Sequence, residues 1–345
     1  MFEKVRSLIF KLDPELAHSL AIKALKTNLF VKQKISDNVL LRSDLFGKEV
    51  NSPIGIAAGF DKDAEVYNSL FNLGFSFVEV GTVTPLKQYG NKKPRVFRLE
   101  EDEALINRLG FNNSGCESVS TRIKKNKPLG VLGVNIGPNW NSKDRVKDFL
   151  IGFNKFENLA DYVTINISSP NTENLRDFHD LTELENLLEK IFAEKKKLNS
   201  NTPIALKVSP DINFNQIKEI SKILIKYKVD ALIVSNTTDQ NRDKLINHQK
   251  FQKGGLSGKP LSDLSNNLIN AFFKNLNGEI KIIGVGGVNS GETAFKKFLS
   301  GANFVQLYTG MVFRGPNIAI KISEELKKIL REKNIKRYSD IIGKL

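Results

Sequence analysis

Cysteine, histidine and tryptophan are scarce in this sequence. Its 345 residues include one cysteine, Cys116, three histidines and one tryptophan. A single cysteine cannot form an internal disulfide or a multi-thiolate metal site, and the histidines lie too far apart in the chain to indicate a zinc cluster. The composition therefore predicts a protein of a reducing compartment whose chemistry uses no metal ion.

Long apolar runs are also missing. No stretch reaches the roughly 18 uninterrupted apolar residues of a transmembrane helix, and the start from Met1 to Arg6 does not lead into the apolar core of a signal peptide. We therefore expect neither a membrane-spanning helix nor export.

Acidic residues are outnumbered by basic ones. Lysine and arginine total 52 against 38 for aspartate and glutamate, which gives a formal net charge of +14. Such an excess can attract nucleic acid, anionic lipid or a phosphorylated ligand. Lysine runs such as Lys195 to Lys197 follow the pattern of solvated helix faces and lack the aromatic interleaving of nucleic-acid-binding proteins. We therefore do not expect a nucleic-acid partner.

Eight short apolar runs alternate with longer helix-like segments from Ile54 onward, which is the pattern of buried parallel strands with crossover helices. Eight strand–helix units in about 260 residues match a (β/α)8 barrel, whose active site lies at the carboxyl ends of its strands. We therefore predict an α/β protein, a (β/α)8 TIM barrel with a small N-terminal helical extension. The runs are Ile54–Gly59, Phe77–Thr82, Val131–Gly137, Tyr162–Ser168, Ile204–Ser209, Ala231–Asn236, Ile280–Gly287 and Phe304–Gly310.

Three connections, after the second, fourth and sixth runs, are longer than a barrel requires. Long loops on the active-site face usually cover or shape the pocket. We expect the cover of the site to be built from these three loops.

The segment before the barrel has its own helical pattern. Asp13 and Pro14 resemble an N-cap followed by proline in the first turn, and a second apolar stripe runs from Leu16 to Leu25. Two short amphipathic helices with basic flanks are expected. Their periodicity does not distinguish packing on the barrel from insertion into a membrane surface. The apolar positions of the first helix are Phe2, Val5, Leu8, Ile9 and Leu12.

Glycine-rich loops follow the last three runs. They are Gly254–Gly258, Gly284–Val288 and Tyr308–Gly310. Barrels commonly bind phosphate between the loops after their last two strands, because glycine lets backbone N–H groups approach the anion. Tight turns alone would need fewer glycines, so the pattern predicts a phosphate site. It matches neither a P-loop nor a complete dinucleotide fingerprint.

Lys207 is a lone charge among apolar residues at the end of the fifth run, where an unpaired charge is costly. Three roles suit it. It could form a Schiff base, act as a fixed cation beside a flavin ring, or form a structural salt bridge.

Asparagines gather at the strand ends. Asn107, Asn166, Asn171 and Asn236 can each donate and accept hydrogen bonds, which suits a small planar ligand with C=O and N–H groups, such as a pyrimidine. Caps and Asx-turns explain any one of these residues, but explain four together less well.

These motifs together resemble the dihydroorotate dehydrogenase family, and more narrowly its class 2, quinone-dependent form. The resemblance covers essentially the whole chain. It implies FMN as cofactor, oxidation of dihydroorotate to orotate in de novo pyrimidine (UMP) biosynthesis, and a membrane quinone, ubiquinone or menaquinone, as electron acceptor. The matching strings are Ala57–Asp63, Gly81–Pro85, Asn107–Asn113, Asn166–Asn171, Ser235–Thr238, Gly254–Gly258 and Ile283–Gly287.

The resemblance also implies roles for individual residues. Ser169 matches the general base that takes a proton from C5, while Thr172 and Phe111 match positions that frame a water-mediated exit for that proton. Substrate contacts are implied for Lys62, Asn107, Arg108, Leu109, Gly110, Phe111, Asn166, Asn171, Asn236 and Thr237. FMN contacts are implied for Ala58, Gly59, Phe60, Asp61, Lys62, Thr82, Asn135, Asn166, Lys207, Ser235, Gly258, Gly287, Tyr308 and Thr309.

Serine at position 169 marks the class, because class 1 members use a cysteine base and Cys116 lies outside this motif. The resemblance makes residues 1–42 a helical extension for membrane docking and quinone access, and residues 43–345 the FMN-binding barrel. The start of the sequence has no transit-like, acid-poor pattern, which favours a peripheral protein on the cytoplasmic face of the bacterial inner membrane over a mitochondrial location. A soluble acceptor, as in class 1, is the alternative, which Ser169 and the N-terminal helices oppose.

Overall fold

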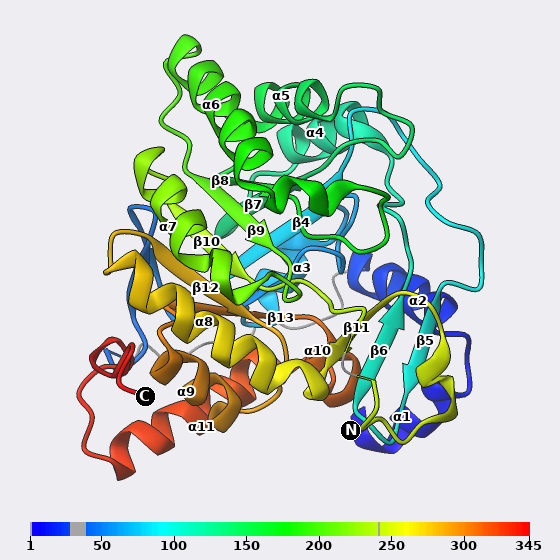
Figure 1. Ribbon diagram of the computed structural model, residues 1–345. Coiled ribbons are helices and arrows are strands. Elements are labelled where there is room, and N and C mark those ends of the chain that lie inside the picture. Colours follow the sequence, from blue (N-terminus) through cyan, green and yellow to red (C-terminus); the bar gives the residue numbers. More distant parts are fainter. Residues whose placement is uncertain (1, 28–38, 241) are drawn as a thin grey trace.

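The computed structural model describes residues 2–27, 39–240 and 242–345. Eight parallel strands form a closed barrel at its centre (Figure 1). Each of the eight predicted runs contains one of these strands, so the (β/α)8 fold is confirmed. In their order around the barrel they are β3 (Ile54–Ile56), β4 (Phe77–Val83), β7 (Val131–Ile136), β8 (Tyr162–Asn166), β9 (Ile204–Val208), β10 (Ala231–Val234), β12 (Lys281–Val285) and β13 (Phe304–Leu307).

Helices surround the barrel and bury one apolar stripe each against it. In α7, for example, Ile217, Ile220 and Leu224 recur at helical spacing and are buried. The helices are α3 (Tyr67–Asn72), α4 (Gly115–Lys125), α5 (Arg145–Phe156), α6 (Leu181–Lys197), α7 (Ile217–Lys226), α8 (Ser262–Leu276), α9 (Gly291–Ser300), α10 (Thr309–Arg314) and α11 (Ile318–Glu332). Short 3-10 helices are η1 (Leu175–His179), η2 (Phe214–Gln216), η3 (His248–Phe251), η4 (Lys259–Leu261) and η5 (Tyr338–Ile341).

Large aromatic side chains fill the amino-terminal end of the barrel. Phe77 and Phe304 are buried with ring centroids 5.9 Å apart. Tyr162 lies over Gly133, where a Cβ atom would come within 2.1 Å of the tyrosine ring, so the strand needs glycine there. A hairpin of β1 (Ser43–Leu45) and β2 (Lys48–Val50) adds Phe46, whose ring lies 5.2 Å from that of Tyr162. The barrel is therefore plugged at this end, and space for a ligand remains at the other.

A three-stranded antiparallel sheet covers the carboxyl ends of the barrel strands. It contains β5 (Val96–Leu99) and β6 (Ala104–Asn107) from the loop after β4, and β11 (Gly255–Gly258) from the loop after β10. The expected cover is confirmed for these two loops. The third long loop, after β8, has η1 in place of a strand.

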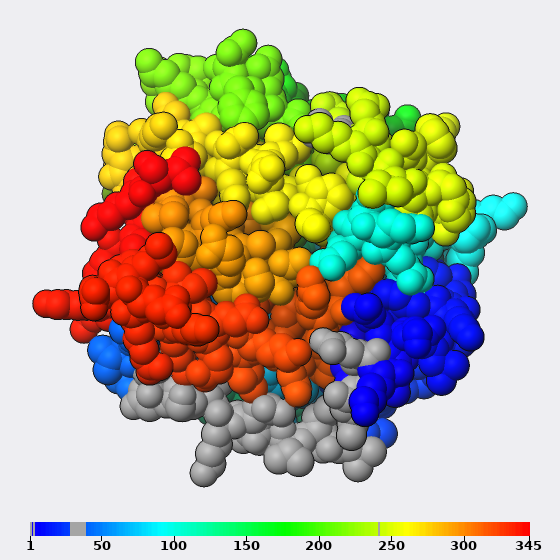
Figure 2. All heavy atoms as spheres, turned by 90° about the horizontal axis from the view of Figure 1, so that it is seen from below, coloured from blue at the N-terminus to red at the C-terminus, as the bar shows by residue number. Residues whose placement is uncertain are grey.

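The expected N-terminal helices are α1 (Phe2–Phe10) and α2 (Pro14–Lys26). They lie on the surface beside the cover sheet, as the blue segment of Figure 2 shows. Arg98 of β5 donates to the carbonyl oxygen of Phe10 at 2.8 Å, so one side of the pair packs on the protein. The remainder of the predicted extension between residues 28 and 38 lies outside the described residues.

The opposite side of α1 and α2 presents apolar side chains to solvent. Leu8 is 67% exposed, and Leu16 and Leu20 are also exposed. The structure therefore shows that the pair packs on the protein, and insertion into a membrane surface stays a prediction that these exposed side chains allow. No helix within the described ranges is both long enough and apolar enough to cross a membrane.

Candidate active site

A cavity lies between the barrel and its cover sheet. Among the described residues, its wall includes residues of β4, β8, β9, β12 and β13 and the residues directly after β3 and β10, and β6 and β11 close the opposite side. The strand ends predicted from the sequence therefore converge on one site. The predicted residues in its lining are Ala58, Gly59, Lys62, Thr82, Asn107, Leu109, Gly110, Phe111, Asn166, Ser169, Asn171, Lys207, Ser235, Asn236, Thr237, Gly258, Gly287, Tyr308 and Thr309.

Glycine loops form one end of the cavity. Gly287 has a φ of +75°, and a Cβ atom there would lie 2.6 Å from the Cβ of Ser262. A Cβ atom on Gly310 would lie 2.4 Å from the carbonyl oxygen of Val288. Both positions therefore need glycine, and their backbone reaches the cavity without a side chain in the way. This arrangement suits a phosphate held by backbone N–H groups.

Lys207 brings an amine to the cavity that has no hydrogen-bond partner among the described residues. The residue is 5% exposed, and no hydrogen bond or ion pair to another described residue satisfies its Nζ. Burial lowers the pKa of Lys207, whereas the carboxylate of Glu79 opposes that shift. The salt-bridge alternative is not supported, because Lys207 forms no ion pair with another described residue. A ligand in the cavity is left to neutralise the charge.

Glu79 lies inside the barrel on β4, and neutral groups satisfy its carboxylate. It accepts hydrogen bonds from Asn135 Nδ2 at 2.8 Å, from Tyr162 OH at 3.0 Å, and from Thr164 Oγ1 and Gln306 Nε2 at 3.1 Å. These four donors occupy the carboxylate oxygens. The network makes a polar floor beneath the cavity and holds Asn135 there.

The predicted amides meet at the carboxyl ends of β8 and β10. Asn171 Nδ2 donates to the carbonyl oxygen of Asn107 at 3.1 Å, and Asn236 Nδ2 donates to Ser168 Oγ at 2.9 Å. Ser169 is 5% exposed, and its Oγ accepts from the backbone N–H of Asn171 at 3.2 Å. The hydroxyl therefore faces a cavity whose walls offer amide donors and acceptors.

The N-terminal extension reaches the same cavity through His18 of α2. His18 Nε2 lies 3.4 Å from Nζ of Lys62, and its ring packs edge-on against Phe60 at 5.2 Å. Burial, reinforced by the Lys62 charge, lowers the pKa of His18 to about 3, so the ring is neutral. Burial also lowers the pKa of Lys62 to about 8, although Glu15 and Asp63 raise it.

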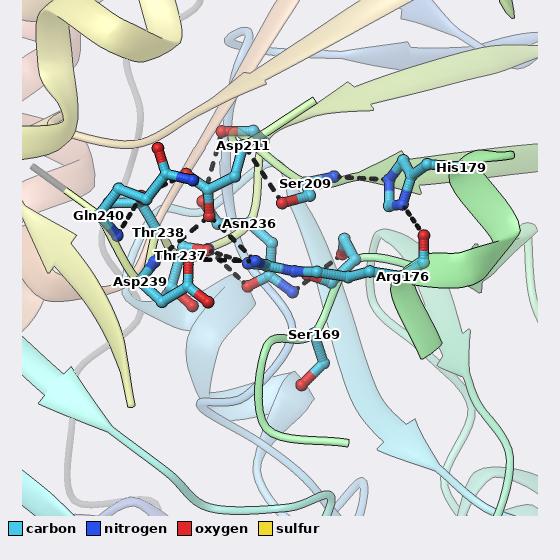
Figure 3. Close-up of polar contacts among 12 residues, drawn as sticks. Ser169, Arg176, His179, Ser209, Asp211, Asn236, Thr237, Thr238, Asp239 and Gln240 are labelled. Atoms are coloured by element: carbon cyan, nitrogen blue, oxygen red, sulfur yellow. Dashed lines mark hydrogen bonds and ion pairs between the residues drawn. The ribbon is translucent and has the colours of Figure 1, made fainter. Parts of the chain in front are cut away.

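Arg176 of η1 ties three loops together behind the site (Figure 3). Its Nη1 pairs with Asp211 at 3.0 Å and Asp239 at 3.3 Å. Its Nε donates to the carbonyl oxygen of Ser168 at 3.3 Å, and its Nη2 donates to that of Thr237 at 3.1 Å. One guanidinium therefore links the loops after β8, β9 and β10.

His179 holds the same loop from its other end. Its Nε2 accepts from the backbone N–H of Ser209 at 3.1 Å, and its Nδ1 lies 2.9 Å from the carbonyl oxygen of Arg176. Burial lowers the pKa of His179 to about 4. The neutral ring can therefore donate from Nδ1 while Nε2 accepts, which fits both contacts.

Five predicted residues lie outside the cavity lining. Asp61 accepts from the backbone N–H groups of Glu65 and Val66 at 2.8 and 2.7 Å, which shapes the loop after β3. Arg108 donates to the carbonyl oxygen of Lys253 at 2.9 Å. The remaining three are Phe60, against His18, Asn135, in the Glu79 network, and Thr172, 8% exposed in the loop after β8.

Three residues that shape the site were not predicted from the sequence. Glu79 is the single charge inside an apolar strand, a signal of the kind that identified Lys207. His18 and Arg176 gave no such signal, since their contacts come from other elements of the fold. Cys116, which lies outside the motif of Ser169, is buried, and burial raises the pKa of its thiol to about 12, so the thiol is not activated as a nucleophile.

Comparison with known proteins identifies the same family along most of the chain. The family described as Dihydroorotate dehydrogenase matches residues 40–330. The dihydroorotate dehydrogenase (quinone) of Bartonella tribocorum is 45% identical over 342 residues, covering 97% of this chain and 95% of the relative. The mitochondrial dihydroorotate dehydrogenase (quinone) of Mus musculus is 40% identical over 342 residues, covering 96% and 87%.

Solved structures give the same result. The crystal structure of dihydroorotate dehydrogenase from Eimeria tenella in complex with ferulenol has a TM-score of 0.92 at 35% identity, covering 96% of this chain and 95% of that one. The ligand-free structure of the Eimeria tenella protein also has a TM-score of 0.92, at 36% identity, covering 96% and 99%. The similarity therefore extends beyond the barrel.

Proposed function

This chain belongs to the dihydroorotate dehydrogenase family, within its quinone-dependent class 2, and on that premise we propose that it oxidises dihydroorotate to orotate with FMN. The proposed electron acceptor is a membrane quinone, ubiquinone or menaquinone, and the proposed pathway is de novo UMP biosynthesis. The observation that supports this most is a single cavity that joins glycine loops, the free cation of Lys207 and the amides around Ser169.

The basic side chains and the accessible backbone of the cavity wall both suit FMN. The glycine loops after β12 and β13 suit the phosphate, and Lys207 suits the electron-rich edge of the ring. FMN, when bound, would accept hydride from the substrate and pass electrons on to the quinone. Among the residues with implied FMN contacts, Phe60, Asp61 and Asn135 would act by supporting the wall rather than by lining it.

The polar side chains of the cavity wall suit the substrate. Lys62 supplies a positive charge for the carboxylate, and the amides of Asn107, Asn171 and Asn236 can bind the ring C=O and N–H groups. Ser169 then takes the proton from C5. A serine hydroxyl is a weak base, so its own proton must move onward to water.

Phe111 and Thr172 are the proposed frame of that exit. Phe111 lines the cavity, and its ring lies close to Gly137, where a Cβ atom would come within 3.0 Å of Phe111 Cε2. Thr172 lies outside the lining and is 8% exposed, in the same loop as Ser169. The proposed proton path therefore leads from the cavity into this loop.

Binding of orotate is expected to weaken as the pH rises above about 8. Lys62 carries its charge below its pKa of about 8 and loses it above, so the attraction for the carboxylate is lost in that direction. The dissociation constant should rise by up to about tenfold per pH unit there. Perturbation of the flavin spectrum by orotate, titrated on both sides of pH 8, measures it. The Lys62→Gln variant should bind more weakly at pH 7, and a retained pH dependence in that variant would contradict the assignment.

Arg176→Lys is expected to slow flavin reduction by dihydroorotate roughly ten- to a hundredfold. Lysine keeps the charge but cannot make the forked contacts that hold the loop of Ser169 against Thr237. Single-turnover absorbance measures the rate, and the change should fall on that rate more than on KM. Asp239→Asn is the control. It removes one half-exposed partner and should cost no more than about fivefold.

We propose that residues 1–42 form the quinone-access and membrane-docking extension, and that residues 43–345 form the catalytic barrel. The cavity lining continues to Val96 and Phe313, and the ring of Phe10 in α1 lies 5.4 Å from that of Phe313. The exposed leucines of α1 and α2 suit a lipid surface. The proposed location is peripheral, on the cytoplasmic face of the bacterial inner membrane.

Removal of residues 1–42 is expected to abolish most quinone turnover and to spare flavin reduction by saturating dihydroorotate. The deletion takes away the helices beside the cavity but leaves Ser169, Lys207 and the glycine loops. Saturating substrate is needed because the deletion also removes the contact between His18 and Lys62. Equal loss of both half-reactions would contradict the assignment of quinone access to residues 1–42 and of flavin reduction to residues 43–345.

The acceptor is tested by steady-state rates with dihydroorotate as donor. We expect turnover with a short-chain ubiquinone or menaquinone, and little turnover with fumarate or a nicotinamide. Efficient turnover with fumarate would contradict the quinone assignment and support the soluble-acceptor alternative.

A further inference from the structure

Two loops at the carboxyl end of the barrel carry a second exposed apolar surface. Leu86 and Tyr89, after β4, are 72% and 79% exposed, and Trp140, after β7, is 71% exposed. We call these three residues the loop patch. Grouped exposed apolar residues of this kind mark interaction surfaces on soluble proteins.

Buried amides fix the backbone under the loop patch. Asn139 accepts from the backbone N–H of Leu86 at 3.0 Å and donates to Gln88 Oε1 at 2.8 Å. Gln88 Oε1 also accepts from the backbone N–H of Trp140 at 3.1 Å. Gln88 and Asn139 are each 6% exposed. These hydrogen bonds therefore join the two loops. The buried amides of Gln88 and Asn139 lie beneath the exposed apolar side chains.

The first loop of the loop patch is linked to α2. Arg95 donates to the carbonyl oxygen of Tyr89 at 2.5 Å and pairs with Glu15 of α2 at 2.6 Å. Glu15 is followed by Leu16 and Leu20, which are exposed. Figure 1 shows the chain between β4 and β5 passing beside α2. The second apolar surface therefore adjoins the proposed docking helices.

Exposed lysines surround the loop patch. Lys87, Lys92 and Lys93 lie in the first loop, and Lys143 follows Trp140 in the second. The Nζ of Lys87 lies 5.1 Å from the ring centroid of Tyr89. Tryptophan and tyrosine favour the membrane–water interface, and lysines beside them favour anionic headgroups.

We propose that Leu86, Tyr89 and Trp140 enter the headgroup region of an anionic membrane beside α1 and α2. This inference rests on the membrane docking proposed above. The protein would then touch the membrane at two joined elements, which fixes the orientation of the cavity relative to the bilayer.

The single tryptophan of the chain makes the test direct, because all tryptophan emission comes from Trp140. Vesicles of phosphatidylcholine mixed with phosphatidylglycerol are added to the FMN-loaded full chain. We expect the emission to move to shorter wavelength and to be quenched by lipids brominated on their acyl chains. The matched variant combines Trp140→Phe with Leu129→Trp. Its tryptophan lies before β7 instead of after it, and the length of this strand separates the two positions by about 20 Å. Its emission should not change with vesicles.

Affinity gives a second readout. Trp140→Gln should weaken vesicle binding about tenfold, which corresponds to the loss of one buried apolar side chain. Lys87→Gln with Lys92→Gln should weaken binding to the anionic vesicles roughly tenfold and leave binding to pure phosphatidylcholine unchanged. Flavin reduction by dihydroorotate should stay unchanged in these variants. Leu8→Ser with Leu16→Ser should weaken binding through α1 and α2.

The outcomes separate this inference from the docking on which it rests. Vesicle binding that depends on Leu8 and Leu16, with unchanged Trp140 emission, would overturn the loop patch and leave the docking helices in place. Absence of vesicle binding would overturn both. An emission shift that follows protein concentration without vesicles would show instead that the loop patch contacts a second copy of the chain.

Discussion

Replacing Ser169 with alanine is expected to slow reduction of the bound flavin by dihydroorotate about 10²–10⁴-fold, the range that a positioned general base supplies. The hydroxyl lies in the cavity wall and is 5% exposed, held by the backbone N–H of Asn171. Alanine removes the proton acceptor without adding bulk. Anaerobic stopped-flow absorbance of the flavin measures the rate.

Two controls separate loss of the base from loss of the site. The variant should purify with the same FMN content and should bind orotate with nearly unchanged affinity, because the surrounding amides remain. Deuterium at C5 of the substrate should slow the variant more than the wild type, since proton removal then limits the rate. Reduction within about threefold of the wild-type rate would rule out Ser169 as the base.

Replacing Lys207 with methionine is expected to slow flavin reduction about 10²–10³-fold, the usual effect of removing one preorganised electrostatic group from a site. Lys207 lies in the cavity wall and is 5% exposed, and its amine makes no ion pair with a described residue, so its proposed charge acts on the bound ligand. Methionine keeps much of the shape and none of the charge. The reduction potential of the bound FMN should fall as well, because the cation stabilises the anionic reduced ring.

The reduction potential of the bound FMN distinguishes the two remaining roles of Lys207, a cation beside the flavin and a Schiff base. Lys207→Arg keeps a positive charge and should retain most of the potential. A Schiff-base role predicts instead that borohydride traps substrate on the protein and that arginine is as damaging as methionine. An unchanged potential in Lys207→Met would contradict the role of a cation beside the flavin.

The barrel could be predicted because parallel strands are buried on both faces and therefore appear as short apolar runs. Each of the eight runs corresponds to a strand, and the polar ends of seven of them line the cavity, the run of β7 being the exception. The hairpin of β1 and β2 was not predicted, because strands of three residues carry no periodic signal. The cover sheet could be predicted only as long loops, since β11 pairs with β6 from a distant part of the chain.

The parts of the site that the sequence did not reveal depend on packing between elements. Arg176 matters because its guanidinium reaches three loops at once, and His18 matters because α2 lies against Lys62. Neither contact has a fixed spacing in the chain. The family resemblance placed Arg108 at the substrate, whereas its side chain lies outside the cavity lining. The local geometry of a loop decides whether a side chain points into the cavity, and a sequence motif does not specify that geometry.

An anaerobic titration of the purified protein with dihydroorotate, followed by a short-chain quinone, tests the central claim most directly. The account predicts a yellow protein whose flavin absorbance bleaches with substrate and returns with quinone. A protein that binds no FMN, or whose flavin dihydroorotate does not bleach, would contradict the proposed function. Bleaching that fumarate but not quinone reverses would contradict the acceptor.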